Sequence, residues 1–205
     1  DIILKVMGIK ISVVLGTFNQ KDILKKVLSA YNDQSFPLEQ FEVIVVDSSS
    51  TDGSDLFYDT FKANFHFISH IQKNNGKAGA RNTGVTLARS NLIIITDADM
   101  IPDQDFVQSH YDAHQNSERM ACFEGTTFNM TSLKWPPKKS DLYPYITRKI
   151  KHGSKLGWYY FLTGNIFFSK EIFLKHKGFN EGFSQYGWED LELGYRLFKE
   201  DIPLY

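Results

Sequence analysis

Leu92-Ile93-Ile94-Ile95-Thr96-Asp97-Ala98-Asp99 is the stretch of sequence that decides the fold. Its run of apolar, mostly β-branched residues predicts a strand that is buried on both faces, as in a parallel sheet. Side chains at positions i and i+2 of an extended chain point to the same side, so we expect Asp97 and Asp99 to lie side by side where the strand ends. Open α/β sheets bind ligands at the carboxyl ends of their strands.

These two acids suit a divalent metal ion. Two carboxylates at one strand end offer the hard oxygen ligands that Mg²⁺ and Mn²⁺ prefer, and such an ion in turn holds phosphate. The alternative is a solvated turn between a strand and a loop, and Asp-x-Asp alone does not distinguish the two. The polar side chains elsewhere in the chain therefore decide how the pair is interpreted.

Length and composition allow one α/β domain and exclude several classes of protein. The chain has 205 residues, of which 42% are hydrophobic, enough for one domain with a sizeable core or for one domain and a small appendage. A formal net charge of −1 provides no field that would attract nucleic acid, and no apolar run approaches the roughly 18 residues of a membrane span. The single cysteine, Cys122, excludes an internal disulfide and favours a reducing, cytoplasmic compartment.

Predicted strands and helices alternate along the first half of the chain, with short loops between them. This alternation predicts a mostly parallel sheet wound in the right-handed sense, with helices on its faces. In addition to the opening stretch, strands are expected at residues 10–15, 41–46, 65–71 and 120–129, and helices at 23–31, from the turn 48–53 to about 61, at 78–88 and from 102 to about 114.

The second half of the chain has a different character. Residues 134–155 carry seven Lys and Arg residues against one Asp, mixed with aromatic residues and prolines, and they predict a long excursion or short helices. After this segment we expect a strand over 159–168 that is interrupted by Thr163-Gly164-Asn165, a short helix over 171–176, and a last helix that opens with Glu189-Asp190.

Four polar clusters fall at the predicted carboxyl ends of strands: Thr17, Asp47, the Asp97/Asp99 pair, and Gly164-Asn165. Chance places one acid at a strand end easily, but it places several at one edge of a sheet less easily. Asp47 is well placed there to accept hydrogen bonds from the base or the ribose of a nucleotide. A local turn around Asp47, or a cap for the next helix, is equally open.

Two further charged clusters lie at predicted helix starts. Lys77 and Arg81 follow the third strand, where a phosphate or a base edge would meet both positive charge and free backbone N–H groups; two solvated cations are the alternative. Glu189 and Asp190 open the last helix, where the helix dipole alone stabilises acids. Their functional interpretation is a carboxylate near the substrate that acts as a general base.

Other familiar chemistries find no support in the sequence. The six histidines show no firm metal-binding spacing, and His110 and His114, which are four residues apart, indicate one face of a helix. No Gly-x-Gly-x-x-Gly motif follows the first strand, and no P-loop lysine motif is present. These observations argue against dinucleotide-dependent oxidoreductases and P-loop NTPases.

At this point the motifs resemble those of family 2 glycosyltransferases of the GT-A fold. Six of them occur in order over nearly the whole chain, which is far more specific than any single motif. The last motif is most similar to the polymerase-like and N-acetylhexosaminyl- or galactosyltransferase branches. The six motifs are residues 13–19, 45–53, 75–84, 96–99, 163–165 and 187–197.

The resemblance implies an α/β GT-A fold, Rossmann-like, with a mostly parallel central sheet and a smaller acceptor-side subregion. It also implies the transfer of a sugar from a nucleoside diphosphate sugar, with a UDP-sugar favoured, to a hydroxyl of a glycan, lipid-linked or other acceptor. The reaction would depend on Mn²⁺ or Mg²⁺ and would invert the configuration of the sugar. Residues 1–128 would form the half that binds the nucleotide sugar, and residues 129–205 the half that binds the acceptor and carries the base.

The same resemblance implies a role for each candidate residue. Asp99, together with Asp97, would hold the metal ion, and Asp97 would also face the ribose or the sugar. Asp190 would deprotonate the acceptor hydroxyl, with Glu189 next to it. The residues implied for the nucleotide sugar are Thr17, Phe18, Asn19, Asp47, Lys77 and Arg81 on the nucleoside side, and Gly164 and Asn165 on the side of the sugar and acceptor.

Some positions depart from the pattern of the family. Gly16 stands where proline is usual, Phe18 where tyrosine is frequent, and Ser48 where a second Asp is frequent. Phe18 can still stack on a base, but it has no hydroxyl to donate. Two other functions are weighed against the transferase. A nucleotide-sugar pyrophosphorylase lacks support because no phosphate-binding glycine loop follows the first strand, and the presence of both Asp99 and Asp190 argues against a non-catalytic module that binds nucleotide sugars.

The basic segment 134–155 has two interpretations. It is either a solvated surface loop or a mobile flap beside the acceptor cleft, whose cations attract an anionic acceptor or an anionic membrane surface. Trp135 and Tyr143 would add apolar anchoring at such a surface. The flap would make the protein peripheral at the inner face of the membrane.

Overall fold

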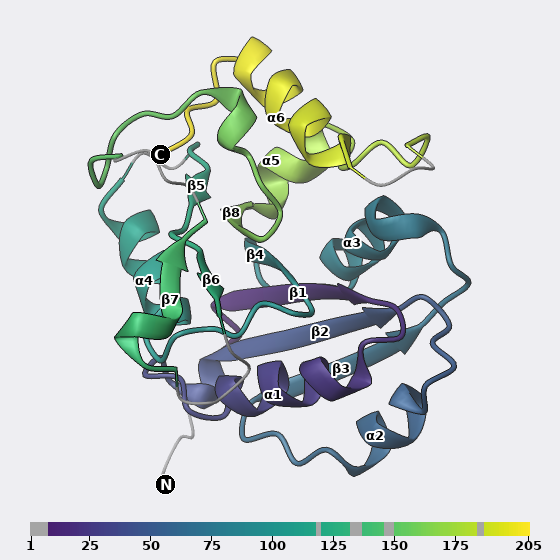
Figure 1. Ribbon diagram of the computed structural model, residues 1–205. Coiled ribbons are helices and arrows are strands. Elements are labelled where there is room, and N and C mark those ends of the chain that lie inside the picture. The colour runs from purple at the N-terminus through teal and green to yellow at the C-terminus, as the bar shows by residue number, and fades with distance from the viewer. Residues whose placement is uncertain (1–7, 118–119, 132–136, 146–149, 184–186) are drawn as a thin grey trace, which may run out of the picture.

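The protein is built around one central sheet with helices on both of its faces (Figure 1). The computed structural model describes residues 8–117, 120–131, 137–145, 150–183 and 187–205. The predicted α/β class with a mostly parallel sheet is confirmed. Within the described residues, no helix combines the length and the apolar character that crossing a membrane would require.

The six strands of the central sheet follow the order β3-β2-β1-β4-β8-β5. The pairs β1–β2, β2–β3 and β1–β4 are parallel, whereas β8 runs antiparallel to both of its neighbours, β4 and β5. The bounds are Ile11–Thr17 for β1, Phe41–Asp47 for β2, His66–Ile71 for β3, Leu92–Asp97 for β4, Phe123–Glu124 for β5 and Asn165–Ser169 for β8.

Two apolar cores lie on opposite faces of this sheet. Residues of β1 alternate between them, so that Val13 and Leu15 belong to the core under α1, α2 and α4, and Val14 belongs to the core under α3, α5 and α6. The helices of the first face are α1 (Lys21–Tyr31), α2 (Ser54–Thr60) and α4 (Phe106–Gln115), and those of the second are α3 (Gly76–Leu87), α5 (Lys170–Lys175) and α6 (Glu189–Lys199).

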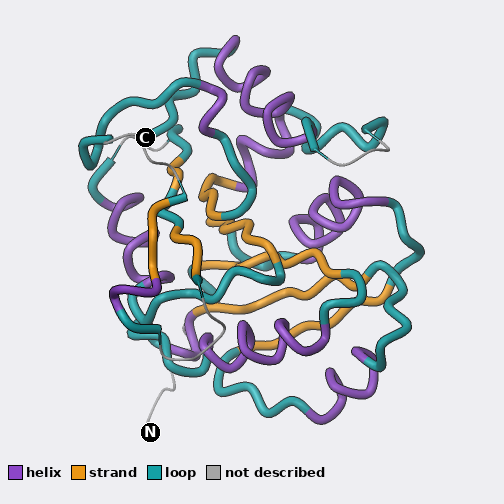
Figure 2. The backbone as a smooth tube through the Cα atoms, in the orientation of Figure 1, coloured by secondary structure: helices purple, strands orange, loops and turns teal. Residues whose placement is uncertain are grey.

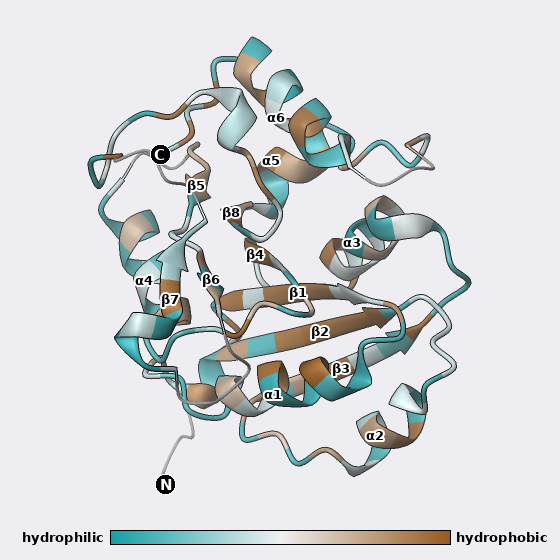
Figure 3. Ribbon diagram, in the orientation of Figure 1, coloured by the Kyte–Doolittle hydropathy of each residue, from teal (hydrophilic) through white to brown (hydrophobic). Residues whose placement is uncertain are grey.

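The strand interiors explain why these segments form a sheet. Every residue of β2 is buried, and most are Val, Ile or Phe, which favour extended backbone. Figure 3 shows the hydrophobic colour concentrated on the central strands. α3 approaches the sheet closely because Gly84 has no side chain: a Cβ atom there would lie 2.3 Å from Val14 Cγ1.

Between residues 120 and 160, the described backbone consists mainly of loops and short elements (Figure 2). β6 (Phe128–Met130) and β7 (Leu142–Pro144) form a separate antiparallel ribbon. Three 3₁₀ turns complete the fold, η1 (Leu38–Gln40), η2 (Lys139–Asp141) and η3 (Trp158–Tyr160). Of the segment 134–155, residues 134–136, which include Trp135, and 146–149 lie outside the described residues.

Three predicted elements were wrong in their extent. The expected strand over 120–129 is two strands in different sheets, and it breaks at Gly125, where a Cβ atom would lie 2.2 Å from the Asn165 amide. The helix expected from Pro102 begins at Phe106, because Gln34 binds the preceding loop: it donates to Asp103 O at 2.7 Å and accepts from Val107 N at 3.0 Å. The expected strand over 159–168 is a 3₁₀ turn followed by β8.

Candidate active site

Polar residues from four strands meet at one edge of the sheet. Thr17 of β1 lies in register with Asp47 of β2, and Gly16 lies in register with Asp97 of β4. Gly164-Asn165 was expected at a carboxyl end, which was wrong: Asn165 begins β8. The cluster still reaches the same edge because β8 is antiparallel, so that its amino end lies beside the carboxyl end of β4.

Arg81 lies at the centre of this edge. It is only 2% exposed, so a solvated cation is the wrong interpretation of this residue. Its Nη2 donates to Asp97 Oδ1 at 2.8 Å and its Nη1 to Glu189 Oε1 at 2.7 Å, while its guanidinium carbon lies 5.7 Å from the centre of the Phe179 ring. The planar, branched guanidinium suits two separate carboxylates, which the single ammonium of a lysine would not serve equally well.

Asn82, the next residue of α3, adds a second connection to the same region. Its side-chain amide donates to Phe179 O at 2.9 Å and accepts from Phe179 N at 2.9 Å. It also donates to Glu181 Oε1 at 2.8 Å. Sequence reasoning assigned Asn82 no role. Together, Arg81 and Asn82 join α3 in the first half of the chain to the loop before α6 and to the start of that helix.

On the nucleoside side, Thr17 and Asp47 are both buried. Within the described structure, the Oγ1 atom of Thr17 has no hydrogen-bond partner, as expected of a group that awaits a ligand. Asp47 accepts from Ser50 N at 2.7 Å and from the hydroxyl of Tyr58 at 2.6 Å. The local turn around Asp47 is therefore present, and sequence reasoning missed Tyr58. Each carboxylate oxygen of Asp47 keeps a second lone pair, so its binding to a base stays a prediction.

The loop after β1 is held in place by the loop after β2. Asn19 adopts a positive φ of 53°. Its Oδ1 accepts from Thr51 N at 2.8 Å, and its backbone N–H donates to Ser50 Oγ at 2.8 Å. Phe18 beside it is 48% exposed, which leaves its ring accessible. Lys77 is exposed in the first turn of α3. The contacts of Asn19 hold the loop after β1 in place in advance of any ligand.

Asp97 and Asp99 differ in their surroundings. β4 ends at Asp97, and the chain turns at Ala98 and Asp99, so the extended geometry expected for the pair was wrong. Asp97 Oδ1 is paired with Arg81, whereas Asp99 is exposed and its carboxylate has no partner among the described residues. Within those residues, no cluster of three or more His, Cys, Asp or Glu side chains could hold a metal ion. Two carboxylates fit Mg²⁺ or Mn²⁺, because these ions keep several waters and phosphate oxygens as further ligands.

Asn165 makes its contacts inside the protein. It is 8% exposed; its Oδ1 lies 2.7 Å from His110 Nε2, and its Nδ2 donates to Thr126 O at 3.4 Å. Burial lowers the pKa of His110 to about 4, so the ring is neutral at pH 7 and its Nε2–H donates to Asn165. The backbone O of Gly164 accepts from the hydroxyl of Thr96 at 2.8 Å. The predicted contact of Gly164 and Asn165 with a sugar stays a prediction.

The two acids at the start of α6 have different environments. Glu189 is 5% exposed and is paired with Arg81. Asp190 is more exposed, and its Oδ1 accepts from Leu191 N at 2.8 Å. Burial raises the pKa of Asp190, and the charge of Glu189 raises it further, while the N–H of Leu191 and the charge of Arg81 oppose this rise. Of the two acids, Asp190 therefore has the more available carboxylate.

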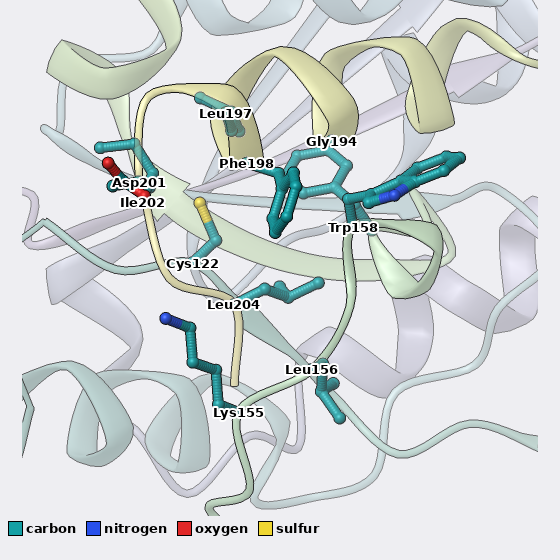
Figure 4. A pocket seen from close by; sticks show the side chains of 11 residues that line it. Cys122, Lys155, Leu156, Trp158, Gly194, Leu197, Phe198, Asp201, Ile202 and Leu204 are labelled. Carbon is teal, nitrogen blue, oxygen red and sulfur yellow. The ribbon is translucent and has the colours of Figure 1, made fainter.

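A pocket lies on another part of the surface of α6 (Figure 4). Apolar side chains form most of its wall, and its empty volume of about 420 Å³ includes space open to solvent. Burial raises the pKa of the Cys122 thiol to about 12, which keeps the thiol protonated. None of the acids described above lines it. Its lining residues are Cys122, Lys155, Leu156, Trp158, Phe161, Gly194, Leu197, Phe198, Asp201, Ile202 and Leu204.

Comparison with known proteins identifies the family. Residues 12–176 match the profile of glycosyl transferase family 2. YfnE of Bacillus subtilis (strain 168), an uncharacterized glycosyltransferase, is 29% identical over 94% of this chain and 61% of its own length. S. aureus TarS 1–349 in complex with UDP matches with a TM-score of 0.71 and 16% identity, over 96% of this chain and 58% of that chain. Mannosyltransferase PcManGT from Pyrobaculum calidifontis, in complex with GDP-Man and Mn²⁺, matches with a TM-score of 0.66 and 18% identity, over 95% of this chain and 53% of that chain.

The chain belongs to family 2 of the glycosyltransferases, because the family profile covers most of its length. The likeness to TarS and PcManGT supports the GT-A fold, as predicted from the resemblance. The chain spans 61%, 58% and 53% of the lengths of YfnE, TarS 1–349 and PcManGT.

Proposed function

We propose that this chain is the part of a glycosyltransferase that binds a nucleoside diphosphate sugar and transfers its sugar, with inversion, to an acceptor hydroxyl. The observation that carries the proposal is the buried Arg81, which brings the carboxylate of Asp97 and the start of α6, with Asp190, to the same edge of the sheet. Membership of family 2 supports the same chemistry.

The donor nucleotide binds over the carboxyl ends of β1 and β2. The unpaired hydroxyl of Thr17, the carboxylate of Asp47 and the exposed ring of Phe18 support recognition of the nucleoside. Asn19, Lys77 and Arg81 complete the set assigned to the nucleotide sugar. A UDP-sugar is favoured from the resemblance, and TarS, which is similar in fold, was crystallised with UDP.

Asp97 and Asp99 are the residues that would hold a divalent ion, Mn²⁺ or Mg²⁺. When bound, it neutralises the charge that develops on the leaving nucleoside diphosphate. PcManGT, which shares the fold, was solved with Mn²⁺. Arg81 orients the Asp97 carboxylate through the hydrogen bond to Oδ1.

Asp190 accepts the proton of the acceptor hydroxyl. As the hydroxyl attacks the anomeric carbon, its O–H bond breaks, the new glycosidic bond forms, and the bond to the diphosphate breaks on the opposite face. The in-line arrangement inverts the configuration, through an oxocarbenium-like state as in glycoside hydrolysis. Glu189 stays paired with Arg81 and orients the helix that carries Asp190. Donor binding is accordingly assigned to residues 1–128 and acceptor binding to residues 129–205.

Two other functions are the alternatives. One is a nucleotide-sugar pyrophosphorylase, which is also an enzyme that acts on nucleotide sugars, and the other is a module that binds nucleotide sugars without catalysis. Both leave Asp190 without a role. Incubation with several nucleotide sugars and Mn²⁺ separates them from a transferase, because only a transferase releases nucleoside diphosphate in proportion to added acceptor.

The basic segment 134–155 is proposed as a flap next to the acceptor site. Lys138, Lys139 and Lys151 are exposed, as are Tyr143 (50%) and Tyr145 (58%). These side chains support contact with an anionic acceptor or with an anionic membrane surface at the inner face. Sedimentation with anionic and neutral vesicles tests the membrane version: we expect anionic vesicles alone to retain the protein, and only at low salt. Retention by neither type contradicts it.

Binding of nucleoside diphosphate is expected to depend on the metal ion. Calorimetry of UDP binding should show a clear loss of affinity when EDTA replaces Mn²⁺, because the negative diphosphate would then face Asp97 and Asp99 without a metal ion between them. Asp99→Asn should weaken binding in Mn²⁺ but should not weaken it in EDTA, where the substitution removes one of the two repelling charges. Asp103→Asn, on the exposed loop before α4, serves as the control. Equal UDP affinity with Mn²⁺ and with EDTA would contradict the role of the metal.

Asp190→Asn is expected to lower the rate of transfer by a factor of roughly 10²–10⁴, which is the typical contribution of a general base. Affinity for the donor should stay nearly unchanged, because the substitution removes a base and no donor contact. Steady-state kinetics with saturating donor, and calorimetry of UDP binding, measure the two effects. Glu200→Gln, beyond the far end of α6, controls for the loss of a charge from this helix. Transfer at the parent rate would show that Asp190 is only a helix-start acid.

A further inference from the structure

Glu124 is a carboxyl group to which the proposed reaction assigns no role. β5 ends at Glu124, and because β5 is antiparallel to β8, this end lies at the same edge of the sheet as the start of β8. Sequence reasoning missed the residue because it placed position 124 in the middle of one long strand. A strand break at Gly125 would have been the signal for a carboxylate at the sheet edge.

The register of the sheet determines which way the Glu124 side chain points. Glu124 pairs with Ile166, which in turn pairs with Ile95. Residues directly opposite each other on antiparallel strands project to the same face. Ile166 and Ile95 both belong to the core under α3, α5 and α6. Glu124 therefore points to the face that α6 covers, and Asp190 lies in the first turn of α6.

The backbone around Glu124 is held on both sides. Its N–H donates to Tyr205 O at 2.8 Å, and the N–H of Gly125 donates to Asn165 O at 2.8 Å. In the side chain, Oε2 accepts from Leu162 N at 3.3 Å. The other carboxylate oxygen, Oε1, has no hydrogen-bond partner among the described residues. It is also absent from the four unpaired side-chain atoms of these residues that are completely buried. One oxygen of Glu124 is thus anchored, and no described residue bonds the other.

The charges around Glu124 come from two helices. Burial raises the pKa of Glu124 well above its usual range, the negative charge of Asp190 raises it further, and the N–H of Leu162 opposes this rise. Glu189 of α6 adds a second negative charge to the region. Arg81 of α3 neutralises the charge of Glu189, because the two form an ion pair. The neutral His110 contacts Asn165, which belongs to the opposite face of β8. Glu124 therefore keeps its proton to a higher pH than an exposed glutamate does.

We propose that Glu124 is the second acid of the acceptor site and that its Oε1 hydrogen-bonds the acceptor hydroxyl next to the one that Asp190 deprotonates. This inference rests on the proposed function. It also defines the class of acceptor: a compound with at least two neighbouring hydroxyls, as a sugar residue has, and not a simple alcohol. A protonated Glu124 donates to one hydroxyl oxygen, while an ionised Asp190 accepts from the other hydroxyl.

The test compares Glu124→Ala and Glu124→Gln with the wild-type enzyme, with methyl glycosides and simple alcohols as acceptors and UDP-sugars with Mn²⁺ as donors. We expect Glu124→Ala to raise the KM for the glycoside acceptor by about tenfold, the loss expected for one hydrogen bond, with the KM for the donor unchanged. Glu124→Gln keeps a neutral donor, so it should restore most of the acceptor affinity. Glu39→Gln, an exposed acid in the turn before β2, is the control.

The pH profile separates contact with the acceptor from a merely structural role. In the wild type, kcat/KM for the acceptor should fall as the pH rises through the raised pKa of Glu124, because Glu124 then ionises and places a second negative charge beside Asp190. In Glu124→Gln this alkaline decline should disappear, while the decline at acid pH, which belongs to Asp190, stays in place. If Glu124 had only a structural role, the pH profiles of kcat/KM for the wild type and for Glu124→Gln would have the same shape.

Two outcomes contradict different parts of the account. An unchanged acceptor KM in both Glu124 variants, with normal wild-type transfer, contradicts the inference alone. A wild-type protein that transfers no sugar contradicts the proposed function, and the inference falls with it. If Glu124→Ala does not fold, Glu124→Gln still tests the inference, because its pH profile of kcat/KM for the acceptor either keeps or loses the decline at high pH.

Discussion

One buried cation holds the candidate site together. The guanidinium of Arg81 is bonded to Asp97 at the end of β4 and to Glu189 at the start of α6. Glu189 lies 108 positions further along the chain than Arg81. A buried carboxylate without a partner is costly, so removal of Arg81 would leave Glu189 in a state that burial disfavours. This single residue therefore fixes the position of α6, and with it Asp190, relative to the parallel part of the sheet.

The surrounding contacts make this arrangement rigid before any ligand binds. Asn82 follows Arg81 in α3. Its side-chain amide makes two hydrogen bonds with the backbone of Phe179. On the same face of α6 as Glu189 and about two turns further on, Arg196 pairs with Glu192 and donates to the carbonyl oxygen of Gly178 at 2.6 Å. A site with such anchors loses little freedom on binding, which favours precise placement of the reacting groups. Burial raises the pKa of both Asp190 and Glu124; the charge of Glu189 raises that of Asp190 further, and the charge of Asp190 raises that of Glu124 further.

The parallel half of the fold was predictable because its information is local. The buried strands that end in Thr17, Asp47 and Asp97 alternate with amphipathic helices, and such an alternation determines the direction of each strand. The antiparallel direction of β8 and the division of residues 120–129 between β5 and β6, which lie in different sheets, were not predictable in the same way. They depend on contacts between distant residues, such as the approach of Asn165 to Gly125, which leaves no room for a side chain. The partners of Arg81 and the position of Glu124 followed from these contacts, so sequence reasoning found Arg81 without its role and missed Glu124.

A double-mutant cycle on Arg81 and Glu189 tests most directly whether this ion pair holds the two halves together. The free energies of unfolding of the wild type, Arg81→Met, Glu189→Gln and the double variant give the coupling between the two side chains. A buried pair of this geometry should couple by about 1.5–3 kcal/mol, whereas the half-exposed Arg196–Glu192 pair, four residues apart on α6, should couple by only about 0.3–0.5 kcal/mol. Additivity of the Arg81 and Glu189 substitutions to within about 0.3 kcal/mol would contradict the account, because α6 would then be held in place without this bond.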